Sequence, residues 1–318
     1  MTHRSKSRAF CVVASLALLT ITPASSFAYA GQAQVPGDRV QSDQDSGQVT
    51  RGRASNRNAR RQQAPAAPSP EQILAEAKEA AATAGLPCNV TNAEFRGITN
   101  ADQRKVYELV CENDFGYMLV TGNETTPATK LSCIEVAATR ARALAANPES
   151  DPGPGCSIAG NDNFLSVLAS YGTQAGLPCA VNEGNVIGRK GENLVFEVGC
   201  EGAQGYRINR TETGWEADDC LTLASTNITC AYTTKDELIA TVKGWMAGSD
   251  AASCDVTDTR YMGRNANGVF IEAACNGADG VIFRMDDAKV VQMVYPCAEA
   301  ALIGGGCALT PGAPRGEG

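Results

Sequence analysis

The chain has 318 residues and a formal net charge of −8, from 27 basic and 35 acidic residues. Such a balance disfavours binding to nucleic acid or anionic lipid, so we expect neither as a partner. Aromatic residues make up only 6% of the chain while cysteines number 13. This composition excludes a large aromatic core and is typical of small domains that disulfides stabilise.

Residues 1–30 have the three parts of a secretion signal: a basic start, an apolar run at 9–22 and a small-residue cleavage pattern that ends at Ala30. The apolar run is too short to span a bilayer, so we expect a cleaved signal rather than a membrane anchor. Cleavage removes Cys11 and His3, the only histidine, and leaves twelve cysteines. An even number is typical of a periplasmic or secreted protein with all cysteines paired.

Residues 31–69 are rich in Gln, Arg, Ser, Ala and Pro and contain few large apolar side chains. Nothing in this composition offsets the entropy of ordering the backbone, so we predict a disordered linker. Its arginines could contact an acidic envelope polymer, but we interpret the segment as a solvated tether.

Three stretches after the linker begin with a helical pattern of apolar residues. The first starts with a capping box, Ser-Pro-Glu-Gln, at residues 69–72, and the third with Thr-Lys-Asp-Glu at residues 234–237. The second follows Asn161 or Asp162, either of which can cap a helix. We therefore predict one helix at the start of each stretch.

Each helix leads into a repeated pattern of strands. A cysteine begins the pattern, and a second cysteine later follows a glutamate by three places and precedes a glycine by five. The first cysteines lie 91 and then 75 residues apart, so the repeats are domains and not solenoid turns. The repeated glutamates are Glu108, Glu197 and Glu272.

The predicted fold class is therefore α+β, with three tandem small domains stapled by disulfides. Each has one helix packed on a three- to four-stranded antiparallel sheet. We call these domains module 1 (residues 70–158), module 2 (159–232) and module 3 (233–310), and we predict a disordered tail at 311–318.

The two faces of each sheet follow from the alternation of side chains along the strands. The face that carries the cysteines is the more apolar one, so we place the helix there. Glu108, Glu197 and Glu272 then point to the opposite face, which an antiparallel sheet can leave in water. We expect these glutamates to be solvated, and they are the candidate residues for binding a partner.

The hairpin register predicts the disulfides. If the first and second cysteines lie directly opposite each other, the turns centre after Thr99, Arg189 and Arg264, in polar sequence. Nine residues separate the third and fourth cysteines in modules 2 and 3, and an insertion widens this spacing in module 1. We pair them locally. The predicted disulfides are Cys88–Cys111, Cys133–Cys156, Cys179–Cys200, Cys220–Cys230, Cys254–Cys275 and Cys297–Cys307.

The sequence contains few of the usual catalytic patterns. A chain without histidine after signal removal has no Ser-His-Asp or Cys-His site, and bridged cysteines supply no thiolate. There is no C-x2-C pair, which argues against zinc. We therefore predict no catalytic, cofactor-binding or metal-binding residues, although paired carboxylates remain possible in principle.

The strand pattern resembles the PepSY domain. In module 3 the resemblance lies in Gly-Val-Phe-Ile-Glu at 268–272, Asp-Gly-Val-Ile-Phe at 279–283 and Asp-Asp-Ala at 286–288. Module 2 has Val-Phe-Glu-Val at 195–198 and Gly-Tyr at 205–206. The chain departs from that family by its four cysteines per unit. The resemblance implies an exported, non-catalytic module, and members of the family are linked to inhibiting or chaperoning peptidases.

Together these features predict a periplasmic or secreted non-enzymatic protein that binds a protein or envelope partner, or inhibits one. One alternative is a structural or stress-resistance envelope protein without a specific ligand. A second alternative is a carboxylate-based hydrolase.

Overall fold

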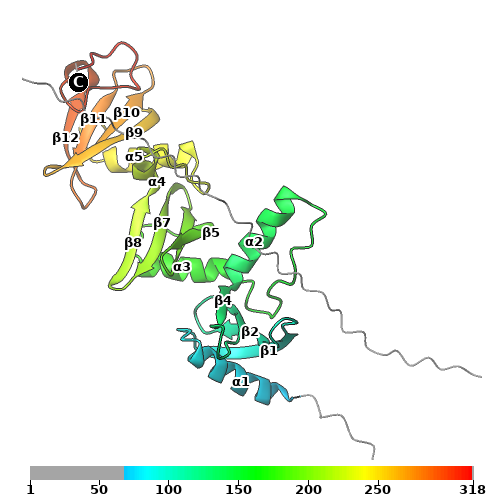
Figure 1. Ribbon diagram of the computed structural model, residues 1–318. Helices are drawn as coiled ribbons and strands as arrows, with labels where there is room; N and C mark the ends of the chain where they lie inside the picture. Colours follow the sequence, from blue (N-terminus) through cyan, green and yellow to red (C-terminus); the bar gives the residue numbers. More distant parts are fainter. Residues whose placement is uncertain (1–67, 317–318) are drawn as a thin grey trace, which may run out of the picture. The chain divides into compact units, whose positions relative to one another are not determined.

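The computed structural model describes residues 68–316. The predicted secretion signal and nearly all of the predicted linker lie outside this range. The described chain contains three antiparallel four-stranded sheets, and within each sheet the strands lie in the order of the sequence. A helix packs against one face of each sheet, as Figure 1 shows. The predicted α+β fold with three repeated units is confirmed.

Module 1 consists of α1 (Pro70–Thr83), β1 (Val90–Ile98), β2 (Lys105–Cys111), β3 (Tyr117–Val120), β4 (Thr129–Ser132) and α2 (Cys133–Ala146). Module 2 consists of α3 (Phe164–Gln174), β5 (Val181–Lys190), β6 (Asn193–Cys200), β7 (Ala203–Thr211), β8 (Gly214–Asp219) and α4 (Cys220–Ala224). Module 3 consists of α5 (Lys235–Met246), β9 (Val256–Asn265), β10 (Gly268–Cys275), β11 (Val281–Met285), β12 (Val291–Pro296) and the short 3-10 helix η1 (Cys297–Glu299).

The helix starts agree only partly with the predictions. The capping boxes at Ser69 and Thr234 are present, and both side chains accept from the backbone three residues on. The predicted cap of α3 is wrong, because the helix begins after Asn163 and the Asn161 side chain donates to Glu108 instead. Helices α2 and α4 were not predicted, although Ser132 forms a capping box with Glu135 at the start of α2.

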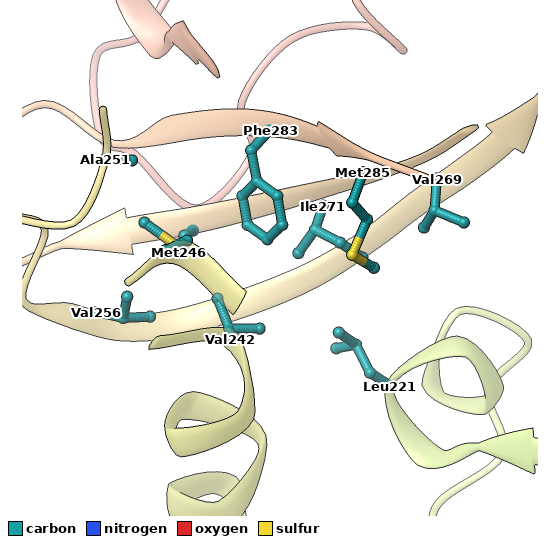
Figure 2. Close-up of a cluster of buried hydrophobic side chains, with 10 residues drawn as sticks. Leu221, Val242, Met246, Ala251, Val256, Val269, Ile271, Phe283 and Met285 are labelled. Carbon is teal, nitrogen blue, oxygen red and sulfur yellow. The ribbon is translucent and has the colours of Figure 1, made fainter. Parts of the chain in front are cut away.

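The helix packs on the cysteine face of each sheet, as predicted. In module 1, Ala77 and Ala81 of α1 contact a buried cluster that includes Tyr107 and Leu109 of β2. In module 3, Val242 and Met246 of α5 pack against strands β9, β10 and β11, and Figure 2 shows this cluster. Small residues on α1 let helix and sheet approach closely, so a thin core suffices.

The predicted hairpin register is wrong by two residues at each turn. The last pairs before the turns are Ile98 with Lys105, Lys190 with Asn193, and Asn265 with Gly268. The second cysteines lie opposite Val90, Val181 and Val256 and not opposite the first cysteines, which accounts for half of the shift. Each first strand also contains two β-bulges, and the two extra residues account for the rest. The first and second cysteines still bridge, at Cα separations of 5.1 to 5.7 Å.

Side chains from each of the first two modules enter the core of the next module. Ile134 and Ala138 of α2 belong to the buried cluster of module 2. Leu221 of α4 is 2% exposed and belongs to the cluster of module 3, where Figure 2 shows it pointing toward the other buried side chains. The modules are therefore coupled by shared cores.

The predicted disordered tail is wrong for residues 311–316, where Arg315 forms an isolated antiparallel bridge with Gly306. Among the described residues, no helix is long and apolar enough to cross a membrane.

Because Leu221 is buried in module 3, Leu221→Ala is expected to lower the free energy of unfolding of that module by about 2–5 kcal/mol. Hydrogen exchange along β10 measures this loss. The matched control is Leu165→Ala on α3, a leucine that is 44% exposed. Unchanged protection of β10 in Leu221→Ala would contradict the shared core.

Candidate functional site

The three repeated glutamates are buried and not solvated. Glu108, Glu197 and Glu272 are 0%, 1% and 0% exposed. The prediction of a solvated sheet face is therefore wrong at these positions. The reason is that the chain after the fourth cysteine of each module crosses the face opposite the helix and covers the glutamate.

Two consecutive backbone amides meet each glutamate. They belong to the two residues that directly follow the fourth cysteine, and a carboxylate can accept both because it has several lone pairs. The donors are Ser157 and Ile158 to Glu108 at 2.7 and 2.8 Å, Ala231 and Tyr232 to Glu197, and Ala308 and Leu309 to Glu272 at 3.0 and 2.6 Å.

An arginine completes each site. Arg96 lies 3.4 Å from Glu108, Arg207 lies 3.1 Å from Glu197, and Arg260 lies 2.6 Å from Glu272. These arginines come from β1 and β9, the first strands of modules 1 and 3, and from β7, the third strand of module 2. A buried carboxylate needs this charge and these donors, because an unpaired one is very costly to desolvate.

The repeated glycine makes room for the crossing chain. A Cβ atom at Gly205 would lie 2.7 Å from Thr233 Oγ1 and 2.9 Å from the Tyr232 carbonyl oxygen. Gly116 and Gly280 are equally crowded, by Asn161 and by Thr310. We call the glutamate, the glycine and the two amides of each module its latch.

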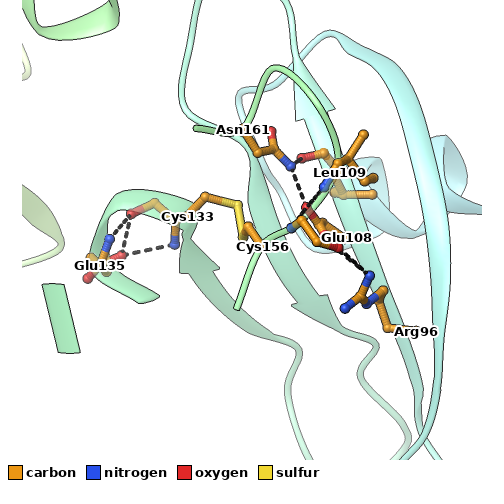
Figure 3. Close-up of a disulfide and its surroundings, with 10 residues drawn as sticks. Arg96, Glu108, Leu109, Cys133, Glu135, Cys156 and Asn161 are labelled. Atoms are coloured by element: carbon orange, nitrogen blue, oxygen red, sulfur yellow. Dashed lines mark hydrogen bonds and ion pairs between the residues drawn. A yellow bond between two sulfur atoms is a disulfide. The ribbon is translucent and has the colours of Figure 1, made fainter. Parts of the chain in front are cut away.

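The local disulfide anchors the latch. Cys133–Cys156, Cys220–Cys230 and Cys297–Cys307 join the start of the loop to the residue just before the two amides. Figure 3 shows this arrangement in module 1, with Arg96 and Asn161 beside Glu108. The structure contains the same six disulfides that the sequence predicts.

Two latches contain a group with metal-ligand spacing. Glu108 lies near Cys133 and Cys156, and Glu272 near Cys297 and Cys307. In both groups the two sulfurs are bonded to each other. A disulfide offers no thiolate, which is the form of cysteine that binds metal, so the oxidised protein has only the carboxylate to offer there.

The latch holds chain segments together and leaves no reactive oxygen facing water. The carboxylate of Glu272, for example, accepts four hydrogen bonds. Two come from the backbone amides of Ala308 and Leu309, and two from Nε and a terminal nitrogen of Arg260. The candidate role of the glutamates in partner binding therefore has no support in their geometry. The sequence did contain a signal for the latch: Cys-Ala-Tyr-Thr at 230–233 matches Cys-Ala-Leu-Thr at 307–310.

Glu197→Gln is expected to lower the free energy of unfolding of module 2 by roughly 3–5 kcal/mol, because it leaves Arg207 without its buried partner. The amides of Ala231 and Tyr232 should also lose protection from hydrogen exchange. Glu201→Gln, in an exposed turn, is the matched control. Retained protection of both amides in Glu197→Gln would disprove the latch.

Gly205→Ala is expected to destabilise module 2 by about 1–3 kcal/mol, since the added methyl displaces the segment at Thr233. Gly188→Ala is the control, because no heavy atom lies within 4 Å of a Cβ built there. Urea denaturation followed by tryptophan fluorescence compares the two. Equal midpoints would show that the glycine is not needed for close approach.

The chain was compared with family models, curated proteins and solved structures, and none matches. The resemblance to the PepSY domain therefore stays a prediction. The latch is the site that the three modules share.

Proposed function

We propose that this chain is an exported, non-catalytic binding protein whose partner is an extended segment of another exported protein. Six disulfides are typical of proteins outside the cytoplasm, which supports export through the predicted signal. The repeated residues serve the latch, so the modules are stable scaffolds and recognition falls to surfaces that differ between them.

The observation that carries this proposal is the edge strand β12. It ends the sheet of module 3 and contains no charged residue, whereas each of the other five edge strands, β1, β4, β5, β8 and β9, contains at least one. Charges on edge strands discourage pairing with foreign strands. An uncharged edge with outward backbone groups favours the addition of a strand from a partner.

The side chains around this edge are also apolar. Met293 of β12 is 47% exposed and Val290, just before the strand, is 54% exposed. A strand added beside β12 would gain backbone hydrogen bonds along its length and would cover these side chains. The partner segment is therefore extended and carries apolar side chains on one face. The acidic surface of the chain supports a protein partner and not a nucleic acid.

A photo-crosslinking residue in place of Gln292 on β12 is expected to trap one exported protein from the envelope fraction of the producing cell. Met293→Lys should abolish this crosslink, because a lysine on the edge opposes strand addition. Leu131→Lys on the edge strand β4 is the matched control, since Leu131 is 45% exposed. The proposal fails if no product forms or if both variants reduce it equally.

A structural role in the envelope is the second candidate. The observation that favours it is that every module contains two disulfides and a buried latch. Resistance to proteases and heat, with no crosslink at β12, would support this role. We do not propose a carboxylate-based hydrolase, because the repeated carboxylates are covered and fully hydrogen-bonded.

A further inference from the structure

The joints between modules follow one scheme. The loop between the third and fourth cysteines of a module, which we call the donor loop, inserts a side chain into the core of the next module. Module 1 inserts Ile134, directly after its third cysteine, and Ala138, four residues further. Module 2 inserts Leu221, at the position that corresponds to Ile134. Module 1 has no module before it in the described chain.

Among residues 68–316, no segment covers the face of module 1 where a preceding donor loop would dock. A groove of about 750 Å³ lies between α1 and the loop from β3 to β4. Its apolar lining comes from Ala80, Ala84, Tyr107, Pro127 and Ala128. The groove is at the turn end of the sheet, on the helix side, because Lys105 at the start of β2 and Thr121 just after β3 also line it.

Module 2 carries aromatic rings at the equivalent positions, and a cavity of about 670 Å³ lies beside them. When the modules are aligned on their first and third cysteines, Ala80 corresponds to Tyr171 and Ala128 to Trp215. The rings of Tyr171 and Trp215 lie 4.8 Å apart, and Arg210 stacks on both. Module 1 therefore has two alanines where module 2 has two large side chains, so the lining of its groove is made of smaller residues.

The donor loop of module 3 carries an unused apolar side chain. Ala298 stands where modules 1 and 2 have Ile134 and Leu221. Leu302 stands five residues after the third cysteine, where α2 has the buried Ala138, and it is 95% exposed. No other large apolar residue reported as exposed in the described chain exceeds 54%.

We infer that copies of this chain associate head to tail, with Leu302 of one copy inserted into the groove of module 1 on the next. The contact continues the scheme by which module 1 docks on module 2 and module 2 docks on module 3. It goes beyond the proposed binding function and uses a different surface from β12.

Charged residues of both signs lie near the two ends, because the donor loop of module 3 carries the exposed Glu299 and Arg315 follows the loop. Glu79 and Glu124 line the groove, and none of the side-chain hydrogen bonds and ion pairs reported for the described residues involves either of them. Glu76 in the same groove is bound to Lys105 at 2.6 Å, and hydrogen bonds from Lys105 and Tyr107 lower the pKa of its carboxyl. At the other end, the exposed Arg315 pairs with Gly306, the last residue of the donor loop before its cysteine.

The geometry of this contact sets the kind of assembly. The contact is heterologous, because a surface on module 3 binds a different surface on module 1. A pair of copies joined by one such contact keeps one free donor and one free acceptor. The product is an open chain of copies, or a ring if the rotation closes. The smallest closed form is a two-fold dimer in which the donor of each copy enters the groove of the other.

Sedimentation velocity of the full, disulfide-bonded chain over a range of concentrations tests the inference. Wild type is expected to associate, either as a series of oligomers or as one closed dimer or ring. Leu302→Asp, which blocks the donor, and Ala80→Trp or Ala128→Trp, which fill the acceptor, should each weaken association roughly thirtyfold or more, as loss of a central contact residue does. Leu165→Asp and Ala145→Trp, at exposed helix positions, are the matched controls and should assemble like wild type.

Mixing the two blocked variants gives the sharpest result. Leu302→Asp keeps its acceptor and Ala80→Trp keeps its donor, so the mixture should form one-to-one dimers and no larger species. A monomeric wild type at every concentration overturns the inference, as does assembly that survives Leu302→Asp. A photo-crosslink from position 80 to residues of the same chain also overturns it, because the groove would then be occupied from within. Met293→Lys should leave assembly unchanged, which separates this result from the test at β12.

Discussion

Each module depends on one buried carboxylate that accepts two consecutive backbone amides. The glutamate is central to a strand, the amides follow the fourth cysteine, and an arginine balances the charge. Without this contact, the segment after the fourth cysteine would leave the sheet and expose its apolar neighbours. The local disulfide and the crowded glycine then have a clear purpose, because both hold the same segment in the same place. The arginine is the variable part, since the first strand supplies it in modules 1 and 3 and the third strand supplies it in module 2.

The sequence predicts the architecture well because its signals are local or repeated. Capping boxes at Ser69 and Thr234, the six cysteine pairs and the antiparallel sheets all follow from short spacings. The environment of Glu197 does not follow, because alternation assigns a side chain to a face but does not say what covers that face. Burial there comes from Ala231 and Tyr232, more than thirty residues later. The hairpin register failed for a related reason, since bulges change the count of residues without changing the apolar pattern.

Modules 2 and 3 are less independent than their repeated sequences imply. Leu221 belongs to module 2 by sequence and to module 3 by packing. Thr241 of α5 accepts a hydrogen bond from the backbone of Gln204 in β7, which adds a second link across the same joint. A domain boundary drawn from the repeat therefore cuts through a packed core. Unfolding of one module should consequently disturb its neighbour, and the chain need not unfold as three separate units.

The donor loops have very different lengths. The third and fourth cysteines are 23 residues apart in module 1 and 10 apart in modules 2 and 3, yet all three latches close in the same way. Both ends of the loop are fixed, so extra residues between them cost little more than a slow logarithmic increase in closure entropy. Apart from the side chains that it inserts into the next module, the loop is thus a place where sequence can be added or exchanged while the scaffold stays intact. It gives evolution, and a protein engineer, a tolerant position for new binding segments on a covalently secured frame.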